Sequence, residues 1–282
     1  MLLRSRGSSP KRTKVQMAKL AAADSAKILM LGNGGAGKTG TLASLAKAGY
    51  KLNILDFDNG TEILYHTLKS DPAALDRVDV EKCQDSFKMG ADKSIKWVTP
   101  LKAFPHALKC LDEWPGQGKP SDWGTDRILV LDSGTFAGDA IFRYVLAANG
   151  KIGVSTDPKA GPTEPNWGSA INLQEDLLAM LTSNLKCHVI VTFHLKDIER
   201  GGINVPMPAA LGKKLPPSVS TYFNHALLVQ SKGMGANAKR TIHTNTQGLI
   251  ELKTAAPGSV KAEYPIETGM ADYFKDVFGP LK

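Results

Sequence analysis

A glycine-rich run constrains the fold of this chain more than any other feature. Residues 28–31 are apolar, residues 32–40 read Gly-Asn-Gly-Gly-Ala-Gly-Lys-Thr-Gly, and helical spacing continues to about residue 48. Glycines at this spacing let backbone N–H groups wrap around a polyphosphate at the positive end of the following helix. The run therefore predicts a strand, a phosphate-binding loop and a helix. The residues expected to hold a nucleotide are Gly32, Asn33, Gly34, Gly35, Ala36, Gly37, Lys38, Thr39 and Gly40.

Two side chains of this P-loop, or Walker A motif, carry its chemistry. Lys38 is expected to reach the β- and γ-phosphates, and the Thr39 hydroxyl to hold Mg²⁺. Asp132 ends the apolar run 127–131 about ninety residues later, where a carboxylate can order the same ion through water. Any buried strand can end in an Asp that only caps a helix, so the assignment of Asp132 depends on its pairing with the P-loop.

Further apolar runs predict a buried sheet. The runs at 51–56, 127–132 and 187–192 are continuous, which is typical of parallel strands covered on both faces. Helical spacing falls between them, at 61–70, 101–114 and 173–184. We expect an α/β fold with a mostly parallel sheet flanked by helices.

The second half of the chain follows a different pattern. Short strand-like segments joined by Gly- and Asn-rich turns lie at 225–230, 240–244 and 249–254, and a last helical segment at about 270–278. They predict a C-terminal antiparallel β extension at one edge of the sheet. Residues 195–217 read as a long Gly- and Pro-punctuated loop, and residues 78–96 have no assignment beyond scaffold.

Charge and composition set the broad class. The net charge is +8, but six of the basic residues precede the first acid, Asp24, which leaves only +2 on the rest. We expect a basic, disordered tail over 1–23 and one domain over 24–282. The tail either contacts phosphates non-specifically or has no role. No run reaches the roughly 18 apolar residues needed to cross a bilayer, and the three dispersed cysteines suggest buried thiols, so we expect a cytoplasmic protein without a membrane partner.

Polar residues at two further strand ends are candidates for catalysis. Asp56 and Asp58 lie two apart at the end of the second strand, and a carboxylate there can orient an attacking water. Asp58 is the better candidate, because it lies further towards the carboxyl end where ligands collect. The alternative is a solvated turn. His194 follows the run 187–192 and could sense the γ-phosphate, or it could be structural.

These segments together resemble the RecA-type ATPase core, in particular the short RecA-like ATPases of phages that assist single-strand annealing. Residues 54–58 are similar to the strand that ends in the catalytic glutamate, with Asp58 in its place, and 129–133 resemble the Walker B strand. His194 stands where that family has a switch glutamine. Residues 253–257, Lys-Thr-Ala-Ala-Pro, are similar to the stretch whose lysine, here Lys253, reaches the neighbouring subunit's nucleotide.

The resemblance implies ATP and Mg²⁺ as ligands, homo-oligomers as rings or filaments, and single-stranded DNA as partner, with a single-strand-binding protein nearby. Two loops would contact DNA, at about 150–166 and 195–217. Their candidate residues are Lys151, Lys159, Trp167, Lys196, Arg200, Lys213 and Lys214. The catalytic set would be Lys38, Asp58, Asp132, His194 and Lys253. The shorter Asp58 and the His194 substitution leave the rate and nucleotide gating of hydrolysis open, and bare surface loops remain the alternative to DNA contact.

Two other readings stay open. The P-loop also resembles that of ParA/MinD-type dimeric ATPases, but Asn33 replaces their first lysine and the stretch 253–257 is then unexplained. A nucleotide-binding switch or loader protein that hardly hydrolyses ATP is the other, kept open by Asp58.

Overall fold

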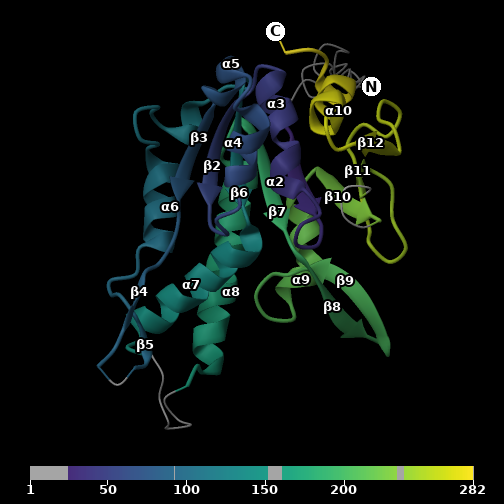
Figure 1. Cartoon of the computed structure of the whole chain (residues 1–282). Helices are drawn as coiled ribbons and strands as arrows, with labels where there is room; N and C mark the ends of the chain where they lie inside the picture. Colours follow the sequence, from purple (N-terminus) through teal and green to yellow (C-terminus); the bar gives the residue numbers. More distant parts are fainter. Residues whose placement is uncertain (1–24, 92, 152–160, 234–237, 282) are drawn as a thin grey trace, which may run out of the picture.

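The fold is built on one large sheet. The computed structural model describes residues 25–91, 93–151, 161–233 and 238–281. Within these ranges the main sheet has eight strands in the order β12-β11-β10-β1-β7-β6-β2-β3 (Figure 1). They are β1 (Lys27–Leu31), β2 (Lys51–Asp56), β3 (Val78–Lys82), β6 (Arg127–Asp132), β7 (His188–Phe193), β10 (His225–Lys232), β11 (Lys239–His243) and β12 (Glu263–Pro265). Strands β10 to β3 of this order run parallel, and β11 and β12 run antiparallel, which confirms the predicted fold class.

Both faces of the sheet are covered because its central strands are apolar on both sides. In β1, Leu29 and Leu31 enter one hydrophobic core, whereas Ile28 and Met30 enter the other. The first core is closed by α6 (Ala103–Asp112), α7 (Gly134–Ala148), α8 (Glu164–Ser183) and α9 (Leu215–Ser218). The second is closed by α3 (Ala43–Lys47), which follows the short α2 (Lys38–Thr41), and by α4 (Glu62–Leu68), α5 (Pro72–Leu75) and α10 (Gly269–Phe278). Side chains of alternating direction thus anchor one strand in two cores.

Two long helices differ from the sequence prediction, and the short α5 and α9 were not predicted. Helix α8 begins at Glu164, nine residues before the predicted start at 173, where the Thr163 and Asn166 side chains form a capping box. Helix α7 was not predicted at all. It follows Asp132 directly, and its N-cap hydroxyl, Ser133 Oγ, accepts a hydrogen bond from Phe136 N at 3.4 Å.

The predicted long loop at 195–217 is wrong, because most of it is a hairpin. Strands β8 (Leu195–Arg200) and β9 (Ile203–Pro208) pair antiparallel across Gly201 and Gly202, and α9 follows. Both glycines have positive φ, 60° and 81°, which a two-residue hairpin turn favours. The prolines of β9 are tolerated because a two-stranded ribbon leaves each strand one edge without ladder bonds.

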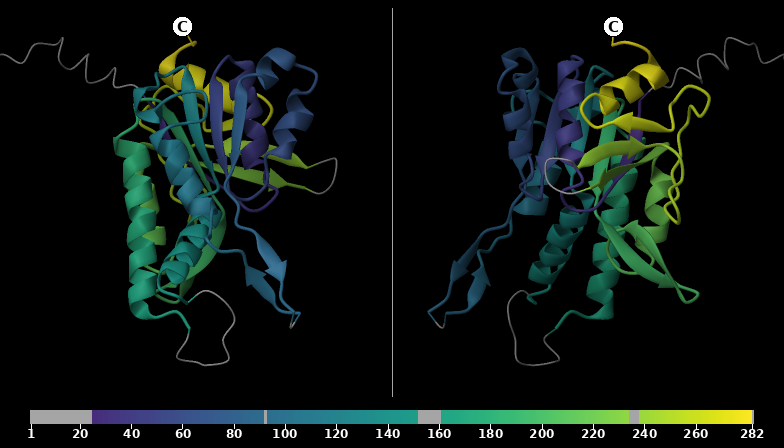
Figure 2. Two further views of the ribbon diagram at one scale, coloured as in Figure 1. Left: turned by 90° about the vertical axis from the view of Figure 1, so that its left-hand side faces the viewer. Right: turned by 45° about the vertical axis from the view of Figure 1, so that its right-hand side comes forward.

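The C-terminal extension also differs in detail. Residues 249–254 form no strand: they contribute only the isolated bridges Gln247–Ile250 and Ala226–Lys253. The third strand of the extension is β12 instead. The unassigned region 78–96 contains β3 and most of a second hairpin, formed by β4 (Phe87–Met89) and β5 (Ile95–Trp97). Both hairpins stand away from the helices at the same end of the molecule (Figure 2).

The predicted basic tail and Lys159 lie outside the described residues. The three cysteines, Cys83, Cys110 and Cys187, are buried free thiols, as predicted. Across the described ranges, no helix has both the length and the apolar character that a membrane crossing requires.

Candidate functional site

The P-loop leaves the carboxyl end of β1 and is held against the neighbouring strand by Gly32 N, which donates to Phe193 O at 3.2 Å. Two of its positions need glycine. A Cβ at Gly32 would lie 2.6 Å from Val229 O, and Gly37 has φ 106° with Ile266 2.4 Å from where its Cβ would be. These glycines allow close approach of backbone to backbone and an αL turn at the start of α2.

Lys38 folds back onto the loop. Its Nζ donates to Gly32 O at 2.9 Å and to Asn33 O at 3.1 Å. Burial lowers the pKa of Lys38, and the nearby Asp132 and Asp58 partly offset that shift. The ammonium therefore has partners within the loop that a phosphate could replace.

Thr39 and Asp132 form the pair expected of a Mg²⁺ site. Thr39 Oγ1 donates to Asp132 Oδ2 at 2.6 Å, and Thr192 of β7 donates to the other oxygen. Burial raises the pKa of Asp132 to about 6, with Asp58 adding to the rise and the two hydroxyls opposing it. A hydroxyl and a carboxylate side by side are the hard oxygen donors that Mg²⁺ prefers, so these residues fit the ion.

The two carboxylates after β2 have different tasks. Asp56 is fully buried and holds the turn: its oxygens accept hydrogen bonds from Asn59 N and Thr61 Oγ1, both at 2.8 Å. Asp58 lines the cavity beside the P-loop and accepts only from Gly60 N, at 3.1 Å, among the hydrogen bonds of the described residues. Asp58, the preferred candidate, is therefore the one placed to meet a ligand.

His194 faces Asp58 across this cavity. Its Nε2 lies 3.6 Å from Asp58 Oδ2 and, within the described structure, is a buried atom without a hydrogen-bond partner. The His194 backbone N–H donates to Thr135 Oγ1 at 3.1 Å, and its ring meets the Phe136 ring at a centroid distance of 5.7 Å. Both of these contacts come from the start of α7, so the ring is held in place from behind.

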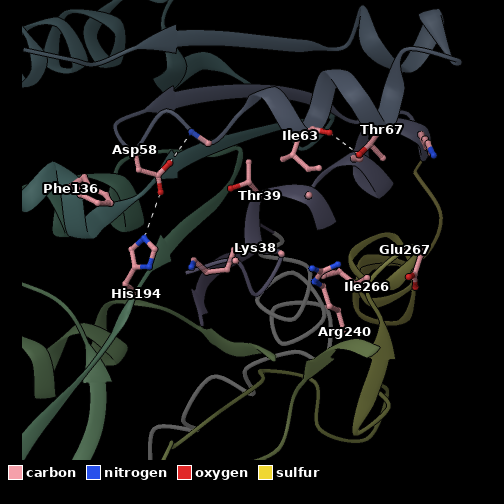
Figure 3. Close-up of a pocket in the computed structure, with 16 residues that line it drawn as sticks. Lys38, Thr39, Asp58, Ile63, Thr67, Phe136, His194, Arg240, Ile266 and Glu267 are labelled. Atoms are coloured by element: carbon pink, nitrogen blue, oxygen red, sulfur yellow. Dashed lines mark hydrogen bonds and ion pairs between the residues drawn. The ribbon is translucent and has the colours of Figure 1, made fainter. Parts of the chain in front are cut away.

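These side chains converge because β7 lies between β1 and β6. Lys38, Thr39, Asp58 and His194 line a cavity of about 710 Å³ (Figure 3). Its opposite wall is formed by residues that sequence reasoning missed: Ile63 and Thr67 of α4, Arg240 of β11, and Ile266 and Glu267 after β12. Arg240 and Glu267 come from the antiparallel edge, and no motif marks them in the sequence.

Lys253, the remaining catalytic candidate, lies elsewhere. It is exposed, and its backbone pairs with Ala226 through hydrogen bonds of 2.7 and 3.2 Å. It lies outside the lining of the described cavity. Its intersubunit role stays a prediction.

The DNA-binding candidates are scattered over the end that carries the hairpins. Arg200, Lys213 and Lys214 are exposed, and Trp167 is 40% exposed with its ring stacked on Phe142. Two lysines have internal partners: Lys151 Nζ donates to Gly161 O at 3.4 Å, and Lys196 Nζ donates to Ala210 O at 2.5 Å. Lys196 thus braces the β8–β9 hairpin from within.

Comparison with known proteins identifies the family of this chain. A family model described as an AAA domain matches residues 24–254, which include the whole cavity lining except Ile266 and Glu267. Among solved structures, the flagellar accessory protein FlaH from Methanocaldococcus jannaschii aligns at 13% identity over 93% of this chain and 95% of its own, with a TM-score of 0.43. A KaiC-like protein from Pyrococcus horikoshii OT3 aligns at 11% identity over 85% and 84%, with a TM-score of 0.37. A comparison with curated proteins finds no match.

Proposed function

This chain belongs to the AAA domain family and has a RecA-like P-loop core, and from that premise we propose that it hydrolyses ATP to ADP and phosphate with Mg²⁺. One observation carries the proposal: Lys38, Thr39, Asp58 and His194, from separate segments of the chain, line one cavity, with Asp132 hydrogen-bonded to Thr39 at its floor. A phosphate ligand, a hard cation and an attacking water each have a matching group there.

The chain's own residues divide the work by position. Lys38 would exchange its loop carbonyls for phosphate oxygens, and Thr39 and Asp132 would hold the cation. Bound Mg²⁺ would neutralise charge on the phosphates. The Asp58 carboxylate accepts a hydrogen bond from the attacking water and so orients it. His194 Nε2 lies 3.6 Å from Asp58 Oδ2, where it stabilises the Asp58 carboxylate or contacts the γ-phosphate. Catalysis by these groups is positioning and electrostatics, as in phosphoryl transfer generally.

Phosphate release by the purified protein tests this activity. Wild type should turn over ATP only with Mg²⁺, and Lys38→Ala should be inactive. Turnover that Lys38→Ala retains would come from a contaminant and contradict the proposal. Nucleotide binding without turnover in wild type would favour the switch or loader alternative, which the short Asp58 keeps open.

We further propose that the protein binds single-stranded DNA and promotes annealing or strand exchange as an oligomer, alongside a single-strand-binding protein. The support is the resemblance of residues 253–257 and the position of His194, which β8 of a projecting hairpin follows directly. A nucleotide sensed at His194 has a short covalent path to that hairpin. The ParA/MinD-like alternative lacks an equivalent for its first lysine, since Asn33 stands there.

Turnover with and without single-stranded DNA tests this second step. We expect DNA to stimulate turnover, and Lys253→Ala to keep ATP binding while losing the stimulated part. Turnover indifferent to DNA would favour the alternatives, and unchanged stimulation in Lys253→Ala would contradict an intersubunit site.

A further inference from the structure

The β4–β5 hairpin has one apolar face and one basic face. Its register pairs Phe87 with Trp97 and Met89 with Ile95. Residues directly opposite each other in an antiparallel pair share a face, and successive residues alternate. The four apolar side chains therefore lie on one face, and the intervening pair, Lys88 with Lys96, lies on the other.

The apolar face is exposed to solvent. Phe87 is 65% exposed, Met89 69% and Ile95 59%, while Trp97 is half-buried with its ring 6.0 Å from that of Phe87. Burying a side chain of this size is worth roughly 1.5–3 kcal/mol, so an exposed cluster of them signals contact with another molecule. The hairpin extends beyond the main sheet at one end of the molecule (Figures 1 and 2).

The root of the hairpin is fixed. Asp85 lies just before β4, and its Oδ1 accepts hydrogen bonds from Lys102 N at 2.8 Å and Ala103 N at 2.9 Å. Its Oδ2 pairs with Arg143 Nε of α7 at 3.4 Å, and the Arg143 guanidinium lies over the Trp97 ring at 4.9 Å. These contacts at the base of the hairpin hold its apolar face in one orientation.

Charge identifies the partner. Residues 86–98 contain Lys88, Lys93 and Lys96 against one acid, Asp92, a net +2. A second copy of the hairpin would carry the same net +2, so contact between copies would add positive charge without adding an acidic surface. Single-stranded nucleic acid combines flat bases, which can stack on the apolar face, with phosphates, which can contact the lysines.

We propose that the β4–β5 hairpin binds single-stranded nucleic acid, with bases stacked on the Phe87, Met89 and Ile95 face and phosphates against the lysines. The proposal rests on the DNA binding proposed above and adds a site that neither predicted DNA loop contains. Each base stacked on an aromatic ring contributes about 1–3 kcal/mol without regard to sequence, so the hairpin supplies affinity with little base preference.

Fluorescence anisotropy of a labelled oligo-deoxythymidine tests the hairpin. Phe87→Ala should weaken binding about tenfold. Lys88→Ala, on the opposite face, should weaken it less and reduce the slope of log affinity against log salt by about 0.7. The matched controls are Tyr65→Ala, an exposed aromatic on α4, and Lys186→Ala, an exposed lysine before β7, which should both bind like wild type.

The outcomes separate the two proposals. DNA-free ATP turnover and the melting temperature should stay at wild-type values in Phe87→Ala and Lys88→Ala. Wild type that binds no DNA would overturn both the proposed DNA function and this site. If wild type binds DNA and both hairpin variants bind it with the same affinity, this site alone would be overturned. A DNA-free oligomer that dissociates in Phe87→Ala would make the face a contact between copies and would also overturn it.

Discussion

The two hairpins leave the same end of the sheet but are built for different purposes. Hairpin β8–β9 pairs over its whole length, buries Met207 against the body and is braced by Lys196. Hairpin β4–β5 pairs over three positions, exposes its apolar face and is held at its root by Asp85 and by Arg143, which lies over Trp97. The first follows the nucleotide cavity at His194, whereas the second follows the sheet edge. Exposure of an apolar face, and not projection alone, distinguishes a surface for partners from an extension of the core.

The largest effect should come from a substitution in the nucleotide cavity, which β8–β9 follows and β4–β5 does not. Asp58→Asn keeps the shape of the side chain but removes the charge that orients water, so ATP turnover should fall about a hundredfold with or without DNA. Nucleotide affinity, measured by calorimetry, and DNA affinity should stay unchanged. Asp126→Asn, at an exposed carboxylate, is the control; equal turnover in the two variants would remove Asp58 from the mechanism.

The root of β4–β5 should matter for stability more than anything further along that hairpin. Asp85→Ala removes the carboxylate that accepts from both N–H groups at the start of α6 and leaves Arg143 without its partner, so the free energy of unfolding should fall by about 2 kcal/mol. Urea unfolding measures this change. Asp126→Ala, which breaks the exposed pair with Lys51, should cost less than about 1 kcal/mol. Equal losses would show that the root is not an anchor.

The same substitution in both hairpins sharpens the contrast. Lys196→Met deletes the ammonium that donates to Ala210 O and Gly212 O, and should cost about 1 kcal/mol in the free energy of unfolding. Lys88→Met, on the exposed ribbon, should leave it unchanged while weakening DNA binding. The contrast between the hairpins would be lost if the melting temperatures of the two variants moved together.

The smallest expected effect is one of dynamics. Adding Mg²⁺ and a non-hydrolysable ATP analogue should slow amide hydrogen exchange in residues 195–208, because His194 joins that hairpin to the cavity. Residues 87–97 should respond to single-stranded DNA instead. Mass spectrometry of exchanged peptides resolves the two segments. A nucleotide response confined to 87–97 would contradict the expected coupling of β8–β9 to the cavity.

Much of the fold and the floor of the cavity could be predicted because they depend on short-range patterns. Continuous apolar runs fixed the parallel strands, and the carboxyl ends of such strands meet at one edge, which brings Lys38, Asp58, Asp132 and His194 together. The roles assigned to these residues stay predictions. The opposite wall escaped prediction because Arg240 and Glu267 reach the cavity only through the register of β11 and β12, which tertiary packing decides.

Helix α7 was missed for a similar physical reason. Gly134 and Gly138 weaken its helical propensity. A Cβ at Gly134 would lie 2.4 Å from the Phe193 ring, and one at Gly138 2.6 Å from Gln174 Nε2. These glycines allow close packing against β7 and α8, a requirement that only the assembled structure makes visible.

The position of its contacts makes the β4–β5 hairpin structurally separable from the rest of the fold. Its paired residues, 87–89 and 95–97, lie outside both hydrophobic cores and outside the nucleotide cavity, and Asp85 holds the junction from before the first strand. Exposed ribbons attached in this way tolerate insertion and replacement. Exchange of the ribbon is therefore expected to alter the proposed nucleic-acid contact while the fold and the nucleotide cavity stay as they are.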